Sequence, residues 1–307
     1  SANKLGNLLE SRLGLQLYQT KENRALVAYI FRLKPIQRLQ VSSFVDTDNS
    51  LEIPVYGDFK VNLKDNFSML VSGASGAGKS YFTYYYLIRF LAQTVGQNHA
   101  RIMAIDPKQS DLYKLCKVSG MPAEDFGTTN AEAFAILKRF TAEMNRRMQV
   151  YADSQAFNSV AIDLGLPPYL LVIEEYSSLV AGMDAKAKKD FENQLAVVVQ
   201  KGRQLSMGAL MVMQQPRSDS ISTNVREQLQ NAVFLGQPTK EAAGMMFGTS
   251  DVPTVSGVGA GLFSIERSNP QEFKSPMFSG DVFNTILPVW KKVMATYPVT
   301  DETALEA

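Results

Sequence analysis

Short, almost wholly apolar runs alternate along most of this chain with longer amphipathic segments. Apolar runs of this length are typical of strands that are buried on both faces. They are residues 67–71, 101–105, 169–173 and 209–213. Between them, apolar positions at helical spacing mark residues 80–92, 131–151 and 186–200. This alternation predicts an α/β fold, in which helices cover both faces of a mainly parallel sheet.

The first 65 residues follow a different pattern. Residues 25–33 form an apolar run rich in strand formers, and residues 52–63 are typical of a hairpin that turns at Gly57-Asp58. We expect three parts: a small α/β or β-rich subdomain over residues 1–65, a large α/β domain over residues 66–298, and an acidic, disordered tail over residues 299–307.

Composition narrows the class of protein. The chain has 307 residues, of which 45% are hydrophobic and 20% charged, and this excludes a wholly disordered or fibrous protein. Cys116 and His99 are the single cysteine and histidine, so an intrachain disulfide and a cysteine- or histidine-rich metal site are excluded. No apolar run approaches the ~18 residues of a membrane-spanning helix. The net charge of +1 neither favours nor excludes nucleic acid, because positive charge can gather on one surface.

Residues 73–80 match the P-loop pattern G-x-x-x-x-G-K-[ST], with a predicted strand before them and a predicted helix after. The glycines let backbone N–H groups turn toward phosphate oxygens, and the helix N-terminus adds partial positive charge. We expect Lys79 to bind the β- and γ-phosphates of ATP and the Ser80 hydroxyl to ligate Mg²⁺. The expected nucleotide-binding residues are Gly73, Ala74, Ser75, Gly76, Ala77, Gly78, Lys79, Ser80 and Tyr81.

Two carboxylates, Glu174 and Glu175, directly follow the apolar strand predicted at residues 169–173. In P-loop ATPases a strand of this kind delivers one acid to the metal, and the next acid polarises the attacking water. We therefore expect Glu174 to ligate Mg²⁺ and Glu175 to act as the catalytic carboxylate. The first acid is usually Asp, so Glu174 alters the geometry.

Four further segments resemble segments of the FtsK/SpoIIIE family of DNA-pumping motors. Residues 101–112 resemble its I-D-P-K-x-x-x-L segment, and residues 143–147 resemble its E-M-x-R-R helix. Residues 201–216 resemble its G-R-A-A-G-I-H…A-T-Q-R-P segment, and residues 257–263 resemble its G-x-G-D segment. With the P-loop, they follow in the order that the family has.

The resemblance implies a RecA-like motor that assembles into a hexameric ring around double-stranded DNA and hydrolyses ATP, with Mg²⁺, to move it. Gln214 falls at the position of the family's polar sensor of the γ-phosphate. Ring ATPases also use an arginine from the neighbouring subunit to neutralise the transferring phosphoryl group. The candidates are Arg146, Arg147 and Arg203, of which we favour Arg146.

Departures from the family pattern point to a particular branch. Met213 and Gln215 replace Thr and Arg beside Gln214, and Ala260 replaces the Asp of G-x-G-D. The sequence is more similar to the coupling ATPases of conjugative elements in Gram-positive bacteria than to chromosome-segregation members. That similarity implies a relaxase and a membrane-anchored transfer or secretion machinery as partners. The chain opens without an initiator methionine, so we expect the cytoplasmic motor part of a longer, membrane-associated protein.

Three alternatives stay open. A type VII-like protein secretion ATPase belongs to the same superfamily, although Asp106-Pro107-Lys108 favours a DNA motor. A nucleotide-binding scaffold with weak hydrolysis is suggested by Glu174. The third alternative concerns the aromatic run at residues 81–86, which we expect to pack in the core, whereas base stacking by one of its members is the other interpretation.

Overall fold

The structure, a computed structural model, describes residues 2–22, 25–32, 38–57, 59–216 and 221–297. It divides into two compact units, residues 1–38 and residues 39–307. The first unit consists of helix α1 (Ala2–Leu13) packed on the antiparallel strands β1 (Gln16–Glu22) and β2 (Val27–Arg32). The tail expected at residues 299–307 lies outside the described residues.

The second unit is built on an eight-stranded sheet, in which the strand order is β10-β9-β11-β12-β6-β13-β14-β15. Along this order, the first six strands, from β10 at the edge to β13, each pair in parallel with the next. Strand β14 pairs antiparallel with β13 and with β15. They are β6 (Met69–Gly73), β9 (Arg101–Ile105), β10 (Phe126–Gly127), β11 (Tyr169–Ile173), β12 (Met207–Met213), β13 (Asn231–Leu235), β14 (Ala260–Ser264) and β15 (Gln271–Lys274). The mainly parallel α/β fold is therefore confirmed, and two of the predicted strands, β9 and β11, have the predicted bounds.

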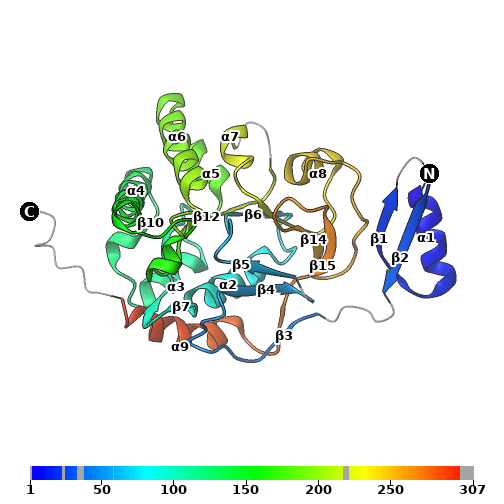
Figure 1. Ribbon diagram of the computed structural model, residues 1–307, viewed down its shortest axis with the longest axis horizontal. Coiled ribbons are helices and arrows are strands. Elements are labelled where there is room, and N and C mark those ends of the chain that lie inside the picture. The colour runs from blue at the N-terminus through cyan, green and yellow to red at the C-terminus, as the bar shows by residue number, and fades with distance from the viewer. Residues whose placement is uncertain (1, 23–24, 33–37, 58, 217–220, 298–307) are drawn as a thin grey trace, which may run out of the picture. The chain divides into compact units, whose positions relative to one another are not determined.

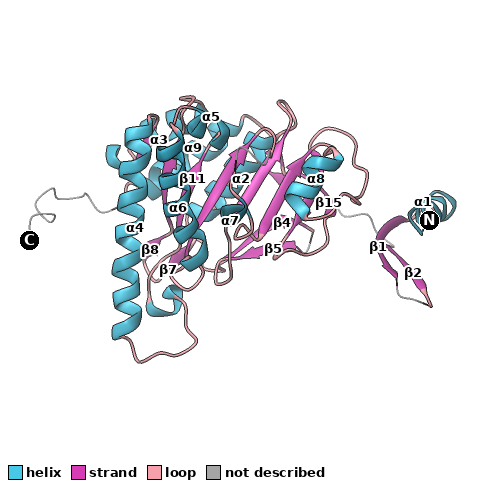
Figure 2. Ribbon diagram, turned by 90° about the horizontal axis from the view of Figure 1, so that it is seen from above, coloured by secondary structure: helices cyan, strands magenta, loops and turns pink. Residues whose placement is uncertain are grey.

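Helices cover both faces of this sheet (Figure 1). On one face α4 (Asn130–Asp153) packs beside α6 (Ala185–Lys201), as the turned view of Figure 2 also shows, and on the other α2 (Lys79–Leu91) packs against α9 (Val282–Met294). The shorter helices are α3 (Asp111–Val118), α5 (Tyr176–Ala181), α7 (Thr223–Arg226) and α8 (Lys240–Phe247). No helix in the described part of the chain is both long and apolar enough to cross a membrane.

Three small strand pairs flank the main sheet. They are the hairpin of β4 (Glu52–Tyr56) with β5 (Phe59–Asn62), β3 (Gln40–Val41) with β16 (Met277–Phe278), and β7 (Thr94–Val95) with β8 (Asn98–His99). The hairpin predicted at residues 52–63 is thus confirmed, with Asp58 of its turn outside the described residues.

The unit boundary lies earlier than the expected residue 65, because the β4–β5 hairpin packs on the main sheet and on α2. The Tyr85 hydroxyl on α2 donates to the Pro54 carbonyl at 2.9 Å, and the rings of Phe59 and Phe263 lie 4.9 Å apart. Gln93, just after α2, accepts from the Leu51 amide at 2.7 Å. Residues 39–65 therefore belong to the core of the large unit.

The aromatic run on α2 is mainly core, as expected. Phe82, Tyr84, Tyr85 and Tyr86 are at most 5% exposed, and burial raises the pKa of each of the three tyrosines. Tyr81 differs, because its side chain is 54% exposed.

Two truncations test the boundary. A chain that begins at Leu39 is expected to unfold cooperatively, at the thermal midpoint of the parent's main transition.

A chain that begins at Asn66 loses four aliphatic side chains that are at most 1% exposed, namely Ile53, Val55, Val61 and Leu63. At about 1.5–3 kcal/mol each, their burial is comparable to the whole stability of a domain, so cooperative unfolding should be lost. Thermal circular dichroism measures this, and equal midpoints for both fragments would restore the boundary at residue 65.

Candidate nucleotide-binding site

Four segments that are distant in the sequence meet at the carboxyl edge of neighbouring parallel strands. The P-loop follows β6, Gln214 follows β12, Glu174 and Glu175 follow β11, and Lys108 lies three residues after β9. The register aligns Ile105 of β9 with Ile173 of β11, so the segments that leave these two strands start level with each other. Ligands of open α/β sheets bind at this edge.

Glycine is required at the start and end of the P-loop. Gly73 has φ 146°, and a Cβ atom there would lie 2.4 Å from the carbonyl oxygen of Leu235 on β13. Gly78 has φ 100° and precedes the first helical residue of α2, Lys79. Other residues rarely adopt these dihedrals, so the pattern of glycines fixes the turn from strand to helix.

The Lys79 ammonium lies inside the loop, where it donates to the carbonyl oxygens of Gly73 at 2.7 Å and Ala74 at 3.0 Å. The residue is 8% exposed. Burial lowers the pKa of Lys79, and the charges of Glu175 and Glu174 oppose this effect. Phosphate oxygens stabilise a buried ammonium more strongly than neutral carbonyls do. The loop is therefore built to receive an anion.

Glu174 is a buried carboxylate with an unpaired oxygen. The residue is 7% exposed, and its Oε2 atom is buried without a hydrogen-bond partner in the described residues. The pKa of Glu174 is raised to about 7, mainly by burial and next by the charges of Asp106 and Glu175, while Lys79 and Lys108 oppose the rise. A buried oxygen without a donor suits a cation ligand.

The donor set fits Mg²⁺ on a nucleotide. Glu174 supplies one carboxylate, and Ser80 lies one residue after Lys79 in the first turn of α2. Within the part of the chain that the structure describes, no three His, Cys, Asp or Glu side chains gather into a metal-binding group. Mg²⁺ is commonly held by one or two protein oxygens, together with substrate phosphates and water, which is the arrangement that these residues allow.

Glu175 has a backbone conformation that non-glycine residues seldom adopt, with φ 50° and ψ 52°. This backbone conformation costs a non-glycine residue on the order of 1 kcal/mol of free energy, and residues that adopt it cluster at functional sites. Its carboxylate accepts from the Lys108 ammonium, with 3.0 Å between Oε2 and Nζ. The Glu175 side chain is 13% exposed and the Lys108 side chain 44%.

The sequence interpretation gave Lys108 no role in the site, although its position carried a signal. A residue three places after β9 must lie near the residues that follow β11, since the two strands are neighbours. Asp106 holds this loop in place: its carboxylate accepts from the Ser110 amide at 2.8 Å, the Ser110 hydroxyl at 2.7 Å and the Tyr113 amide at 3.2 Å. The Asp-Pro-Lys segment therefore combines a buried loop anchor with an exposed cation.

Gln214 lies next to the P-loop, and its backbone ties the two together. Its carbonyl oxygen accepts from the Gly73 amide at 3.3 Å and from the Ser72 hydroxyl at 3.2 Å, while its side chain is exposed. The expected sensor residue is thus at the same edge as the carboxylates.

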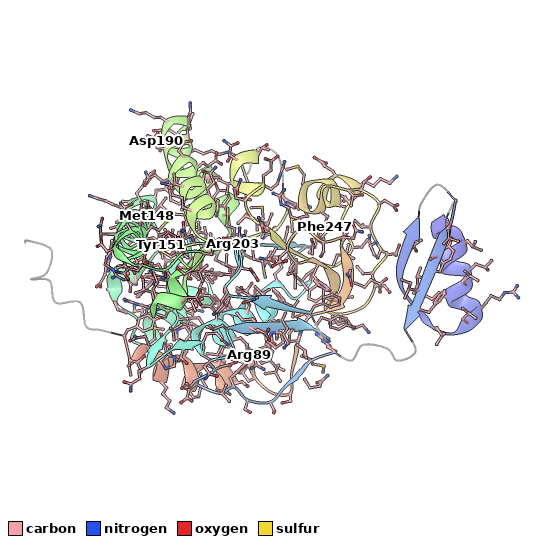
Figure 3. All side chains as sticks on the ribbon, viewed as in Figure 1. Arg89, Met148, Tyr151, Asp190, Arg203 and Phe247 are labelled. Carbon is pink, nitrogen blue, oxygen red and sulfur yellow. The ribbon has the colours of Figure 1, made fainter. Side chains whose placement is uncertain are left out.

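The three candidate arginines lie elsewhere. Arg147 is 2% exposed and is held by Glu143 at 2.7 Å and by the Leu205 carbonyl at 2.9 Å, so it supports the fold and is not free to reach a neighbour. Arg203, labelled in Figure 3, has a 67% exposed side chain 3.6 Å from Asp65.

Arg146 has a 54% exposed side chain that pairs with Glu143 at 2.7 Å. It lines a hollow of about 290 Å³ with Arg101 and Tyr297. Arg101 is the first residue of β9, so this hollow lies at the amino edge of the sheet, opposite the P-loop.

Comparison with known proteins gives a family and a fold. The model of the FtsK/SpoIIIE family matches residues 37–242. The FtsK domain-containing protein YdcQ of Bacillus subtilis is 26% identical over 249 residues, which cover 77% of this chain and 50% of YdcQ. The DNA translocase FtsK of Mycobacterium tuberculosis is 22% identical over 305 residues, which cover 92% of this chain and 35% of that protein. The chain thus spans half or less of these relatives.

Two solved structures share the fold. The conjugation coupling protein TcpA of pCW3, in its monomer form with ATPγS, matches with a TM-score of 0.67 at 15% identity over 95% of this chain and 85% of that chain. EssC (ATPases 2 and 3) from Geobacillus thermodenitrificans matches with a TM-score of 0.62 at 18% identity over 87% of this chain and 52% of that chain. At these identities the likeness is evidence of fold.

Glu174 should make stability depend on pH. In the unfolded chain its carboxyl ionises near pH 4.3, whereas the folded chain retains the proton up to about pH 7. The folded state therefore binds more protons in this window, and the free energy of unfolding falls as pH rises through it. Glu174→Gln should remove this fall, and should be about 3–4 kcal/mol more stable than the parent at pH 8 without Mg²⁺.

Urea denaturation at pH 5 and pH 8, with a chelator present, measures this effect. Glu241→Gln is the matched control, because it makes the same change on an exposed side chain in the first turn of α8. The same pH dependence in the parent and in Glu174→Gln would contradict the assignment.

Proposed function

The chain belongs to the FtsK/SpoIIIE family, and from this premise we propose that it is an ATPase that couples hydrolysis to the movement of double-stranded DNA. The strongest support is the gathering of Lys79, Glu174, Glu175 and Lys108 at one edge of the sheet, next to the P-loop. Two cations and two carboxylates in electrostatic contact are the groups that phosphoryl transfer requires.

Each residue has a separate task in this proposal. Lys79 exchanges its carbonyl partners for the β- and γ-phosphates. Ser80 and Glu174 hold Mg²⁺, which when bound neutralises charge on the phosphate oxygens. Glu175 orients and polarises the attacking water. Lys108 positions the Glu175 carboxylate through the 3.0 Å contact.

The position of Arg146 supports assembly into a ring. Arg146 lies at the amino edge of the sheet and so cannot serve the P-loop of its own subunit. We favour Arg146, and next Arg203, as the arginine that acts on a neighbour's nucleotide in a homo-oligomeric, hexameric ring around DNA. Gln214 is the proposed sensor that links the γ-phosphate to β12.

The proposed biological setting is conjugative transfer. TcpA, which shares the fold over most of both chains, is a conjugation coupling protein. We propose that the chain is the motor part of a longer protein that works with membrane-associated transfer machinery and a relaxase. The match to EssC keeps the secretion ATPase as the second candidate, and only the response to DNA separates the two.

Lys108→Met tests the positioning role. It should lower the turnover number for ATP roughly ten- to a hundredfold, because Glu175 loses the partner that fixes its carboxylate, while KM changes little. Lys108→Arg should restore part of the turnover. Lys114→Met, an exposed lysine on α3, is the control and should behave like the parent. A parental turnover number in Lys108→Met would remove Lys108 from the mechanism.

The steady-state ATPase rate with and without long double-stranded DNA tests the proposed function. DNA should stimulate turnover, and the stimulation should fade as salt rises, since phosphate contacts weaken with salt. Glu175→Gln should still bind ATP but turn over about 10²–10⁴-fold more slowly, and Lys79→Ala should lose ATP binding.

The other outcomes discriminate between the alternatives. Turnover that is indifferent to DNA would favour the secretion motor. Binding without turnover in the parent would favour the nucleotide-binding scaffold. Normal turnover in Glu175→Gln would show that Glu175 is not the catalytic carboxylate.

A further inference from the structure

Two exposed apolar side chains flank the P-loop, and neither has a task in the proposed hydrolysis. Val258 is 90% exposed and Tyr81 is 54% exposed. Single exposed apolar residues are common on protein surfaces. These two differ from other exposed residues because the backbone that carries each of them lies against or within the phosphate-binding region.

Val258 stands on a tight turn that touches the P-loop. The turn is closed by the Ala260 amide, which donates to the Gly257 carbonyl at 3.2 Å, and Gly257 and Gly259 have φ values of 96° and 73°. A Cβ atom on Gly78 of the P-loop would lie 3.9 Å from the Cα atom of Gly259. The Val258 side chain is thus raised into solvent directly beside the phosphate site.

The turn is braced from two sides. The Ser275 amide donates to the Gly259 carbonyl at 2.8 Å, and the Gly236 amide donates to the Ala260 carbonyl at 2.8 Å. Gly236 follows β13, and Ser275 follows β15. The turn that carries the exposed valine is therefore hydrogen-bonded to the segments that follow β13 and β15.

Tyr81 is tied to the same region. It lies in the first turn of α2, two residues after Lys79, and its ring lies 6.2 Å from that of Phe278. Phe278 is 8% exposed and comes three residues after Ser275, which holds the Val258 turn. One short segment, residues 275–278, thus supports both exposed side chains.

We propose that Tyr81 and Val258 form the binding surface for the purine base of the nucleotide whose phosphates the P-loop binds. This inference rests on the proposed function, since it takes the P-loop to be a nucleotide site. A base presents flat apolar faces, and contact with aromatic and aliphatic side chains gains affinity without any charged partner.

The strand order gives the direction of the nucleotide. Along the sheet the order is β11-β12-β6-β13-β14, with the P-loop at β6 in the middle. Glu174 and Glu175 follow β11 on one side, and the Val258 turn precedes β14 on the other. Figure 1 shows β12, β6 and β14 in this order. The reacting γ-phosphate must lie toward the carboxylates. The opposite end of the nucleotide therefore points toward Val258.

The test compares two ligands that share phosphates and differ in the base, Mg²⁺-ATP and Mg²⁺-tripolyphosphate. Calorimetry measures their dissociation constants for the parent, Tyr81→Ala and Val258→Ser. Each variant should weaken ATP binding about tenfold and leave tripolyphosphate binding within about twofold of the parent. Val118→Ser is the matched control, a 53% exposed valine at the end of α3, and should bind both ligands like the parent.

Three other outcomes of these binding measurements would each contradict a different claim. Parental ATP affinity in Tyr81→Ala and Val258→Ser, with both ligands lost in Lys79→Ala, would remove the base surface and leave the phosphate site standing. Equal loss of both ligands in Tyr81→Ala and Val258→Ser would assign the two side chains to the P-loop structure instead of the base. Unchanged binding of both ligands in Lys79→Ala would overturn the proposed function itself. Far-UV circular dichroism confirms that each variant is folded.

Discussion

Parallel pairing of β9, β11, β12 and β6 is the constraint on which the rest of this molecule depends. Parallel neighbours send their following segments out at the same edge, so residues more than a hundred positions apart become neighbours. The register between neighbouring strands decides which of the following residues lie beside each other. Because Ile105 pairs with Ile173, Lys108 lies 3.0 Å from Glu175. A shift in that register would move both carboxylates away from the P-loop while the glycine pattern stayed intact.

The balance of charge at this edge of the sheet is the second constraint on the site. Lys79 and Glu174 are both buried, and each carries the cost of desolvation that the other only partly offsets. Glu175 and Lys108 are more accessible and satisfy each other directly. In the proposed function, a phosphate stabilises the buried ammonium and a metal ion stabilises the buried carboxylate. In the proposed function, the Glu175 carboxylate that Lys108 holds is the group that orients the attacking water.

The sequence predicted the central strands, the P-loop and the two carboxylates because these features are local. It missed β13, β14, β15 and α9. Within β14, Gly261 weakens the strand signal, and a Cβ atom there would lie 2.3 Å from the Phe234 carbonyl. Inside α9, Pro288 is a residue that normally argues against a helix. The contact of Lys108 with Glu175 and the packing of residues 39–65 depend on tertiary neighbours, which the alternation of apolar residues cannot identify.

Arg146 and the P-loop lie at opposite edges of one sheet, and this separation constrains symmetry. If the arginine of one subunit completes the site of the next, the two contact surfaces are different patches, and the interface is heterologous. A two-fold dimer would instead pair like with like, leaving both nucleotide sites without their arginine. Only a head-to-tail arrangement completes every site, and it does so without free ends when it closes on itself. Under that condition each site in the cycle takes its arginine from one neighbour only, which gives the order of sites around the ring a direction.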